Sequence, residues 1–172
     1  ANQSSFQELS HLKRQESQED DILEALQSMA TINNAIDYMT ADLQAAVHAA
    51  TDITGFGFSG HSMQLANASQ VTLSIQAEKL PRFTKTFSCL EHSFLTKAHR
   101  TNAEYTEPNI DVSNLDQLHR LLIHDPQTSG GLLLSISPAV SHAMIQALRS
   151  KFKSAEIVGQ VLPRQHKALV FE

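Results

Sequence analysis

The residues with the clearest capacity for chemistry lie in the stretch 51–60, which reads T-D-I-T-G-F-G-F-S-G. Asp52 supplies a carboxylate, and the glycines that follow, among them Gly55 and Gly57, leave backbone amides open to close approach. A carboxylate beside a glycine-rich helix start can bind a hard cation such as Mg²⁺ while the amides face anionic groups such as phosphate oxygens. The alternative is structural: the glycines permit a tight turn and close packing on a neighbour.

The same glycines spell G-x-G-x-x-G, the string found in dinucleotide-binding turns. Such a turn needs a buried parallel strand before its first glycine, a helix at its last, and an acid at the end of the next strand. A helix can follow the last glycine, and Glu78 closes a predicted strand over 71–77. The residues before the first glycine continue a helical pattern, however, and Asp52 would be costly in a strand buried on both faces. We therefore set a dinucleotide site aside.

A second glycine loop, D-P-Q-T-S-G-G, spans residues 125–131 and precedes an apolar run. One interpretation is a turn with glycine at positive φ that packs closely on a neighbour. The other is a pocket for an anion or nucleotide, lined by the hydroxyls of Thr128 and Ser129 and by backbone amides. Asp125 can be a turn residue or a ligand, and its place before Pro favours the turn.

Histidine and cysteine residues do not predict a metal or nucleophile site. The nine histidines include His119 and His124, five residues apart, and His92 and His99, seven apart, but there is no H-E-x-x-H. With one cysteine, no four-ligand zinc set can be assembled from local spacing. Cys89 has His92 three residues on, yet nothing nearby indicates a third orienting group, so we do not expect a catalytic thiol.

Helical spacing of apolar residues predicts most of the elements that position these loops. Ser17 and the acids after it are typical of a helix start. That helix is expected to bury Ile22, Leu23, Leu26 and Met29. A second apolar stripe, Ile32, Ile36, Met39, Leu43 and Val47, indicates further helix. Three more helices are expected over about 62–69, over about 83–92 and after Ser137-Pro138, and another, capped by Ser113 or Asn114, carries Leu115, Leu118, Leu121 and Leu122.

Strand signals alternate with these helices. Residues 71–77 alternate apolar and polar, as a half-buried strand does, and the apolar run 132–136 is expected to be a buried strand. Further strands are expected near 110–112, 155–162 and 168–171, whereas 97–107 is a polar stretch without an assigned element. The order lacks a strict β-α-β rhythm, so we predict an α+β fold in which a mixed or antiparallel sheet packs with helices.

Bulk composition narrows the class of protein. The 172 residues are 41% hydrophobic with a net charge of -5, which favours a globular protein and gives no electrostatic footprint for nucleic acid. No apolar run approaches the roughly 20 residues of a membrane span. The single cysteine fits a reducing compartment, so a cytoplasmic location is expected, with neither nucleic acid nor membrane as a partner.

Two blocks together closely resemble a known enzyme family. T-D-I-T-G-F-G-F-S-G-H (51–61), followed downstream by D-P-Q-T-S-G-G-L-L (125–133), resembles selenophosphate synthetase, also called selenide, water dikinase. S-M-A-T-I-N (28–33), the Arg100-x-Asn102 pattern and I-V-G-Q-V (157–161) support the resemblance. The wider relatives are the aminoimidazole ribonucleotide synthetase-like enzymes, which use ATP, and the resemblance implies the fold of their C-terminal domain.

The resemblance covers nearly the whole chain but only the C-terminal half of the family protein. It implies an arm over 1–16 that connects to a preceding ATP-binding domain, and a C-terminal domain over 17–172. In the family the preceding domain holds the reactive Cys or selenocysteine, a neighbouring Lys, most of the metal ligands and the dimer barrel. We therefore expect that domain as a partner, a homodimer at full length, no catalytic residue in this chain, and no activity from the chain alone.

The family reaction converts ATP, selenide and water to selenophosphate, AMP and phosphate with Mg²⁺. By resemblance, Asp52 matches the family residue that contributes to Mg²⁺ coordination at the ATP phosphates. Gly55, Gly57, Thr128 and Ser129 match motif positions as candidate ATP-binding residues, with backbone geometry the first expectation. K-A-H-R-T-N replaces a frequent Gly-Gly-Thr pattern, which puts a substrate role for 97–102 in doubt.

Two alternatives remain open from the sequence. The chain can be a non-catalytic binding or assembly domain that retains the fold, which the presence or absence of a reactive Cys or selenocysteine and Lys upstream would decide. It can also belong to another ATP-using enzyme of the superfamily, such as thiamine-monophosphate kinase, although the D-P-Q-T-S-G-G block argues against that assignment.

Overall fold

The computed structural model describes residues 19–172, so the expected arm and the expected cap at Ser17 lie outside the described part. Its largest sheet has the strand order β3-β6-β2-β5. The bounds of these strands are β2 (Val71–Ile75), β3 (Ile110–Asp111), β5 (Gly159–Pro163) and β6 (Leu169–Phe171). Strand β2 pairs antiparallel with β5 and parallel with β6, which in turn pairs parallel with β3. The sheet is therefore mixed, as predicted.

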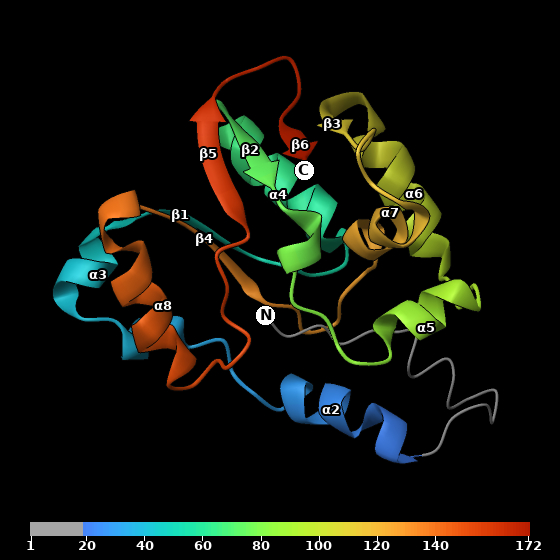
Figure 1. The fold of residues 1–172 in the computed structure, drawn as a ribbon, viewed down its shortest axis with the longest axis horizontal. Helices are drawn as coiled ribbons and strands as arrows, with labels where there is room; N and C mark the ends of the chain where they lie inside the picture. The colour runs from blue at the N-terminus through green and yellow to red at the C-terminus, as the bar shows by residue number, and fades with distance from the viewer. Residues whose placement is uncertain (1–18) are drawn as a thin grey trace.

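The remaining two strands form a separate antiparallel pair, β1 (Val47–Asp52) with β4 (Leu132–Ile136). Figure 1 shows this pair between two groups of helices, with α3 (Ala41–Ala45) and α8 (Ser141–Arg149) on one side. The other group accompanies the four-stranded sheet: α4 (Gly57–Ala68), α5 (Thr86–Glu91), α6 (Lys97–Thr106) and α7 (Gln117–His124). The α+β class is confirmed, but its strands are divided between two sheets.

Each group of helices has its own apolar core. The larger core joins α4 and α7 to the four-stranded sheet, and its most buried members include Ala66, Leu122, Ile123, Leu169 and Phe171. The smaller core lies under the two-stranded sheet and consists of Ala35, Leu43, Met144 and Leu148 with partly buried neighbours. The loops that connect β1 to α4 and α7 to β4 run from one core to the other, so both cores fix their position.

The N-terminal third departs from the prediction. The helix expected over the 32–47 stripe is instead a 3-10 turn at Ala35–Tyr38, the short α3 and the start of β1. In α2 (Glu19–Met29), Leu23 and Leu26, predicted to be buried, are 49% and 43% exposed. Of the 32–47 stripe, Leu43 is buried in the smaller core, and Met39 and Val47 pack against it. Ile32 and Ile36 are exposed.

Two further differences concern the polar middle of the chain. The stretch without an assigned element forms α6, and α7 begins after Asp116 rather than after Ser113 or Asn114, because the Asp116 carboxylate accepts a hydrogen bond from the N–H of His119 at 2.9 Å. Within residues 19–172, no helix has the length and apolar character that crossing a membrane requires.

Candidate functional site

Strand β1 ends at Asp52, which places this residue at the start of the glycine turn. Asp52 is the last residue of the strand, stands opposite Leu132 of β4, and has an exposed side chain. The expectation that a helix precedes the glycines is therefore wrong. The dinucleotide interpretation still fails, because β1 pairs only antiparallel with β4, and α4 begins at Gly57 rather than at the last glycine.

The two glycine loops, although distant in the sequence, lie directly against each other. The N–H of Ile53 donates to the carbonyl of Gly131 at 2.9 Å, and the N–H of Gln127 donates to the carbonyl of Thr54 at 3.1 Å. From outside the pair, the amide of Asn33 donates to the carbonyl of Gly130 at 2.7 Å. The two sequence blocks thus form one structural unit that continues the β1–β4 pairing.

Glycine is required at two contacts of this unit. Gly57 has a φ of +68°, and a Cβ there would lie 2.9 Å from the carbonyl oxygen of Asp125. A Cβ at Gly130 would lie 2.0 Å from the carbonyl oxygen of Ile53. The close-packing interpretation of the second loop therefore fits, but among the described glycines the positive φ is found at Gly57 in the first loop and not in the second. Gly55, by contrast, faces open space.

Polar side chains fill the interior behind the two loops. The Nδ2 atom of Asn102, in α6, donates to the carbonyls of Gly55 and His124, each at 3.0 Å. Oγ of Ser59 lies 2.8 Å from Nδ1 of His124. Asp125, expected as a turn residue, is instead 1% exposed, with its Oδ1 3.2 Å from Nε2 of His99.

Burial controls the charge of the two interior histidines. It lowers the pKa of His99 to about 4, with the neighbouring His124 adding to the effect, and it lowers the pKa of His124 to about 4 as well. Both imidazoles are therefore neutral near pH 7. The N–H of Thr96 donates to Nδ1 of His99 at 3.3 Å, which puts the ring hydrogen on Nε2, the atom that faces Asp125.

The outer side of the unit is open and carries a different set of groups. Nε2 of His61 lies 2.9 Å from the hydroxyl of Thr54. The exposed ring of Phe56 packs between His61 and Tyr105, with ring centroids 5.7 and 5.6 Å away. Burial lowers the pKa of His61, and the nearby charge of Asp52 partly offsets this effect. This face can present a carboxylate, a hydroxyl and an imidazole to a bound ligand.

The other predicted site residues lie on the same unit. Thr128 is exposed and Ser129 half-buried, in the loop that leads to Gly130. Within residues 19–172, no group of three or more His, Cys, Asp or Glu side chains is arranged to hold a metal ion. The donors present thus suit one carboxylate contact to Mg²⁺, which commonly takes one or two protein carboxylates together with phosphate and water oxygens.

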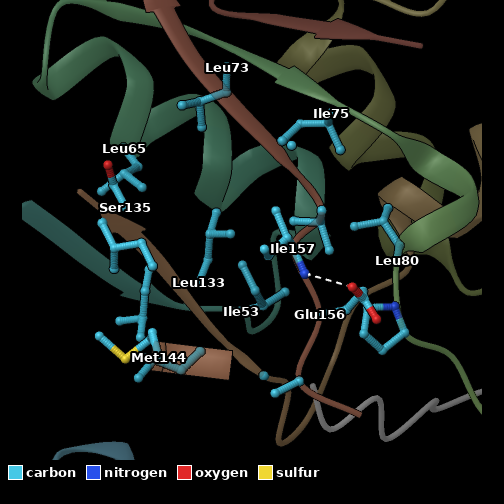
Figure 2. Close-up of a pocket in the computed structure, with 18 of the residues that line it drawn as sticks. Ile53, Leu65, Leu73, Ile75, Leu80, Leu133, Ser135, Met144, Glu156 and Ile157 are labelled. Atoms are coloured by element: carbon cyan, nitrogen blue, oxygen red, sulfur yellow. Dashed lines mark hydrogen bonds between the residues drawn. The ribbon is translucent and has the colours of Figure 1, made fainter. Parts of the chain in front are cut away.

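A large cavity lies on the inner side of the unit, between the two sheets. Its volume is about 820 Å³, and Figure 2 shows that its labelled lining is mainly aliphatic, including Ile53, Leu73, Leu133 and Ile157. Asp52 does not line it. A triphosphate placed there would lose its hydration without compensating charges, so the cavity does not suit ATP.

Sequence reasoning missed the role of α6. His99 and Asn102 reach the two loops from inside, yet the sequence pattern predicts no element for this stretch and puts a substrate role in doubt. The Arg100-x-Asn102 pattern was the available signal, but Arg100 itself is 75% exposed and pairs with Glu104 at 3.7 Å. The buried residues of this helix are polar, so an apolar periodicity could not reveal it.

Comparisons with known proteins give relatives along nearly the whole chain. A family described as AIR synthase related protein, C-terminal domain, matches residues 2–172. Two curated relatives named selenide, water dikinase, from Nitrosomonas eutropha and Bdellovibrio bacteriovorus, are each 69% identical over 161 residues. Each alignment covers 94% of this chain but 46% of the relative, so the chain spans about half the length of the curated relatives it matches.

Solved structures agree at the level of the fold. Hydrogenase maturation protein HypE in complex with ATP superposes with a TM-score of 0.54 and 16% sequence identity, over 83% of this chain and 37% of that one. A second HypE structure gives a TM-score of 0.50 at 16% identity, over 77% of this chain and 34% of that one. At this sequence identity the structural similarity supports a shared fold and nothing more.

Proposed function

The chain belongs to the family of AIR synthase related proteins, C-terminal domain, and from this we propose that it is the C-terminal domain of a selenide, water dikinase and supplies Asp52 to a shared ATP–Mg²⁺ site. The resemblance predicted from the two sequence blocks is confirmed by the curated relatives. The observation that carries the proposal is the position of Asp52: an exposed carboxylate at the end of β1, where both blocks meet.

The proposed chemistry suits a site with a single carboxylate from this chain. Phosphoryl transfer depends mostly on positioning the phosphates and neutralising their charge, and a bound Mg²⁺ would supply that neutralisation. Asp52 would be its contact on this side, with the remaining acids supplied by the part of the protein outside this chain. The charge of Asp52 acts on His61, whose Nε2 lies 2.9 Å from the hydroxyl of Thr54, so we assign these two side chains to orienting waters near the carboxylate.

The glycines and the hydroxyls are assigned different roles within the proposal. Gly57 is packed against Asp125, so its role is to shape the turn. Gly55 is exposed and has open space above it, so its amide region can be approached by a phosphate. Thr128 and Ser129 would face the same ligand from the second loop, and they are the candidates for direct contact.

The partner is proposed to be an ATP-binding domain that shares the site, within a homodimer at full length. Exposed apolar side chains support a docked partner: Leu23, Leu26, Ile32 and Ile36 at the N-terminal end and Phe56 in the glycine turn. Isolated exposed apolar residues are common, but several large ones on neighbouring elements favour a covered surface. Selenide and water are the proposed co-substrates, by analogy with the names of the relatives.

The decisive experiment is an Asp52→Asn substitution in the full-length protein. We expect kcat for ATP-dependent selenophosphate formation to fall at least ~100-fold, because preorganised charge stabilisation at the phosphates is lost. Glu91→Gln, at an exposed carboxylate on α5, is the matched control and should leave kcat unchanged. Turnover near that of the wild type in Asp52→Asn would exclude the metal-ligand role.

The rival function is an assembly domain that retains the fold without the chemistry. It predicts that the full-length protein binds no Mg-ATP, which isothermal titration would show directly. Binding that weakens in Asp52→Asn and not in Glu91→Gln would exclude this rival.

A further inference from the structure

We propose that α6 is a positioning element for the Asp52 site: His99 and Asn102 hold the glycine turn 53–57 and the loop 124–131 in one fixed relation. The inference rests on the proposed function, because it concerns the same carboxylate. Its structural half, the joining of the two loops by α6, can be tested without catalysis.

Asn102 joins the two loops through a single atom. Its Nδ2 donates both to the carbonyl of Gly55 and to that of His124, at 3.0 Å each, and the residue is 4% exposed. A buried carbonyl that loses its donor destabilises a protein by about 1–3 kcal/mol. The loops therefore cannot separate without leaving at least one carbonyl unsatisfied.

His99 adds a second attachment one helical turn earlier. The N–H of Thr96 donates to Nδ1, so the hydrogen of the neutral ring is on Nε2, which lies 3.2 Å from Oδ1 of Asp125. Both side chains are almost fully buried, at 4% and 1% exposed. Burial disfavours a charged imidazole and lowers the pKa of His99 to about 4, so the ring is neutral at neutral pH.

The contact between the loops transmits any displacement to Asp52. Gly57 has no spare room against the carbonyl of Asp125, so movement of the second loop pushes on the first. Ile53, the residue after Asp52, is hydrogen-bonded to Gly131. A misplacement of about 1 Å at a reacting centre can lower the rate ~100-fold.

Some polar side chains of α6 face the two loops, and others face solvent. His99 and Asn102 face the loops, whereas Arg100 lies between them in sequence, is exposed and pairs with the exposed Glu104. This division explains how the 97–102 stretch can matter for the site without touching substrate. It also provides a control on the same helix.

The test compares Asn102→Leu with Arg100→Ala in the full-length protein. Leu has a similar size and removes both hydrogen bonds. Amide hydrogen exchange in peptides covering 53–60 and 124–131 is expected to accelerate at least ~10-fold in Asn102→Leu and to stay unchanged in Arg100→Ala. In the same variant kcat should fall about 10- to 100-fold while the KM for ATP changes less than about 3-fold.

A second pair of variants allows the test to be made even if Asn102→Leu does not fold. His99→Gln keeps an N–H donor near the position of Nε2, and His99→Leu does not, so His99→Gln should retain several-fold more of the wild-type kcat and show slower exchange in both loops. If Asn102→Leu does not fold, this pair decides with the same measurements.

The possible outcomes separate this inference from the proposed function. A folded Asn102→Leu or His99→Leu protein with unchanged loop exchange, or with faster exchange and unchanged kcat, overturns the positioning role. If Asp52→Asn remains fully active, the proposed function fails, while the exchange data still show whether α6 joins the loops.

Discussion

At the scale of single residues, the adjacent Asp52 and Ile53 lie in different environments, one in solvent and the other in the apolar core. Ile53 is 5% exposed and belongs to the larger core, whereas the preceding Asp52 is exposed. The neighbouring backbone is held by hydrogen bonds to the second loop rather than by the carboxylate. Substitution of Asp52 should therefore change the chemistry of the site with little effect on folding.

Gly55 and Gly57, two residues apart in the glycine turn, differ in the space available for a side chain. Gly57→Ala places a Cβ at positive φ and 2.9 Å from the carbonyl of Asp125, so we expect a loss of about 2–4 kcal/mol in the free energy of unfolding. Gly55→Ala meets nothing within 4 Å and serves as the matched control. Urea denaturation measures both, and equal midpoints for the two variants would contradict the close-packing role of Gly57.

At the scale of elements, α7 begins at a residue that the sequence pattern did not favour. The Asp116 carboxylate accepts from the N–H of His119 at 2.9 Å, and Ser113 lies outside the helix. Asp116→Ala should destabilise the protein by about 1 kcal/mol, as loss of a helix N-cap usually does, and Ser113→Ala by less than about half of that. Thermal denaturation distinguishes them, and a larger effect at Ser113 would restore the original assignment.

Elements with apolar faces could be predicted from the sequence, and the polar ones could not. Strand β2 forms where its sequence predicts, but four of its five residues are buried, so it is not the half-buried strand that the alternation indicates. Helix α4 covers the range predicted from 62 onward and buries Met63 and Ala66. Helix α6 buries the polar residues His99, Asn102 and Thr106, which the sequence pattern does not distinguish from surface residues. The partners of His99 and Asn102 include residues of loops distant in the sequence. Strand β1 was missed since its interior is mostly Ala, His and Thr, and its extended form depends on β4.

In the candidate site too, some features could be predicted from short stretches of sequence and others depend on tertiary contacts. Asp52 and the two glycine loops could be singled out locally, because their residue types and spacing are visible in short stretches of the sequence. Their direct contact required the β1–β4 pairing, which joins residues some eighty positions apart in the sequence. Hydrogen bonds such as those of Asn102 depend on three elements meeting, and no local pattern encodes them.

At the scale of the whole molecule, the interior histidines make stability depend on pH. The folded-state pKa values of His99 and His124 are lowered to about 4 from the usual 6.5, so between these values the unfolded chain binds more protons than the folded one. Their contribution is complete above about pH 6.5 and is lost as the pH falls toward 4. The loss is on the order of 3 kcal/mol for each histidine.

Urea denaturation at several pH values between 4 and 7 measures this dependence. His99→Gln should flatten the dependence, whatever its effect at pH 7, because one of the two titrating groups is removed. His142→Gln changes an exposed histidine of α8 and should leave the slope as it is in the wild type. Identical slopes in the two variants would show that His99 does not titrate differently on folding.

The position of β6 sets the order in which the protein can be assembled during synthesis. Strand β6 lies between β3 and β2, although it leaves the ribosome after both of them. At the usual rate of translation, β2 therefore waits about 5–20 s for its parallel neighbour. During that interval its apolar residues Leu73 and Ile75 have no finished sheet to enter. Chaperones that bind exposed hydrophobic segments should consequently engage the nascent chain between residue 75 and residue 169.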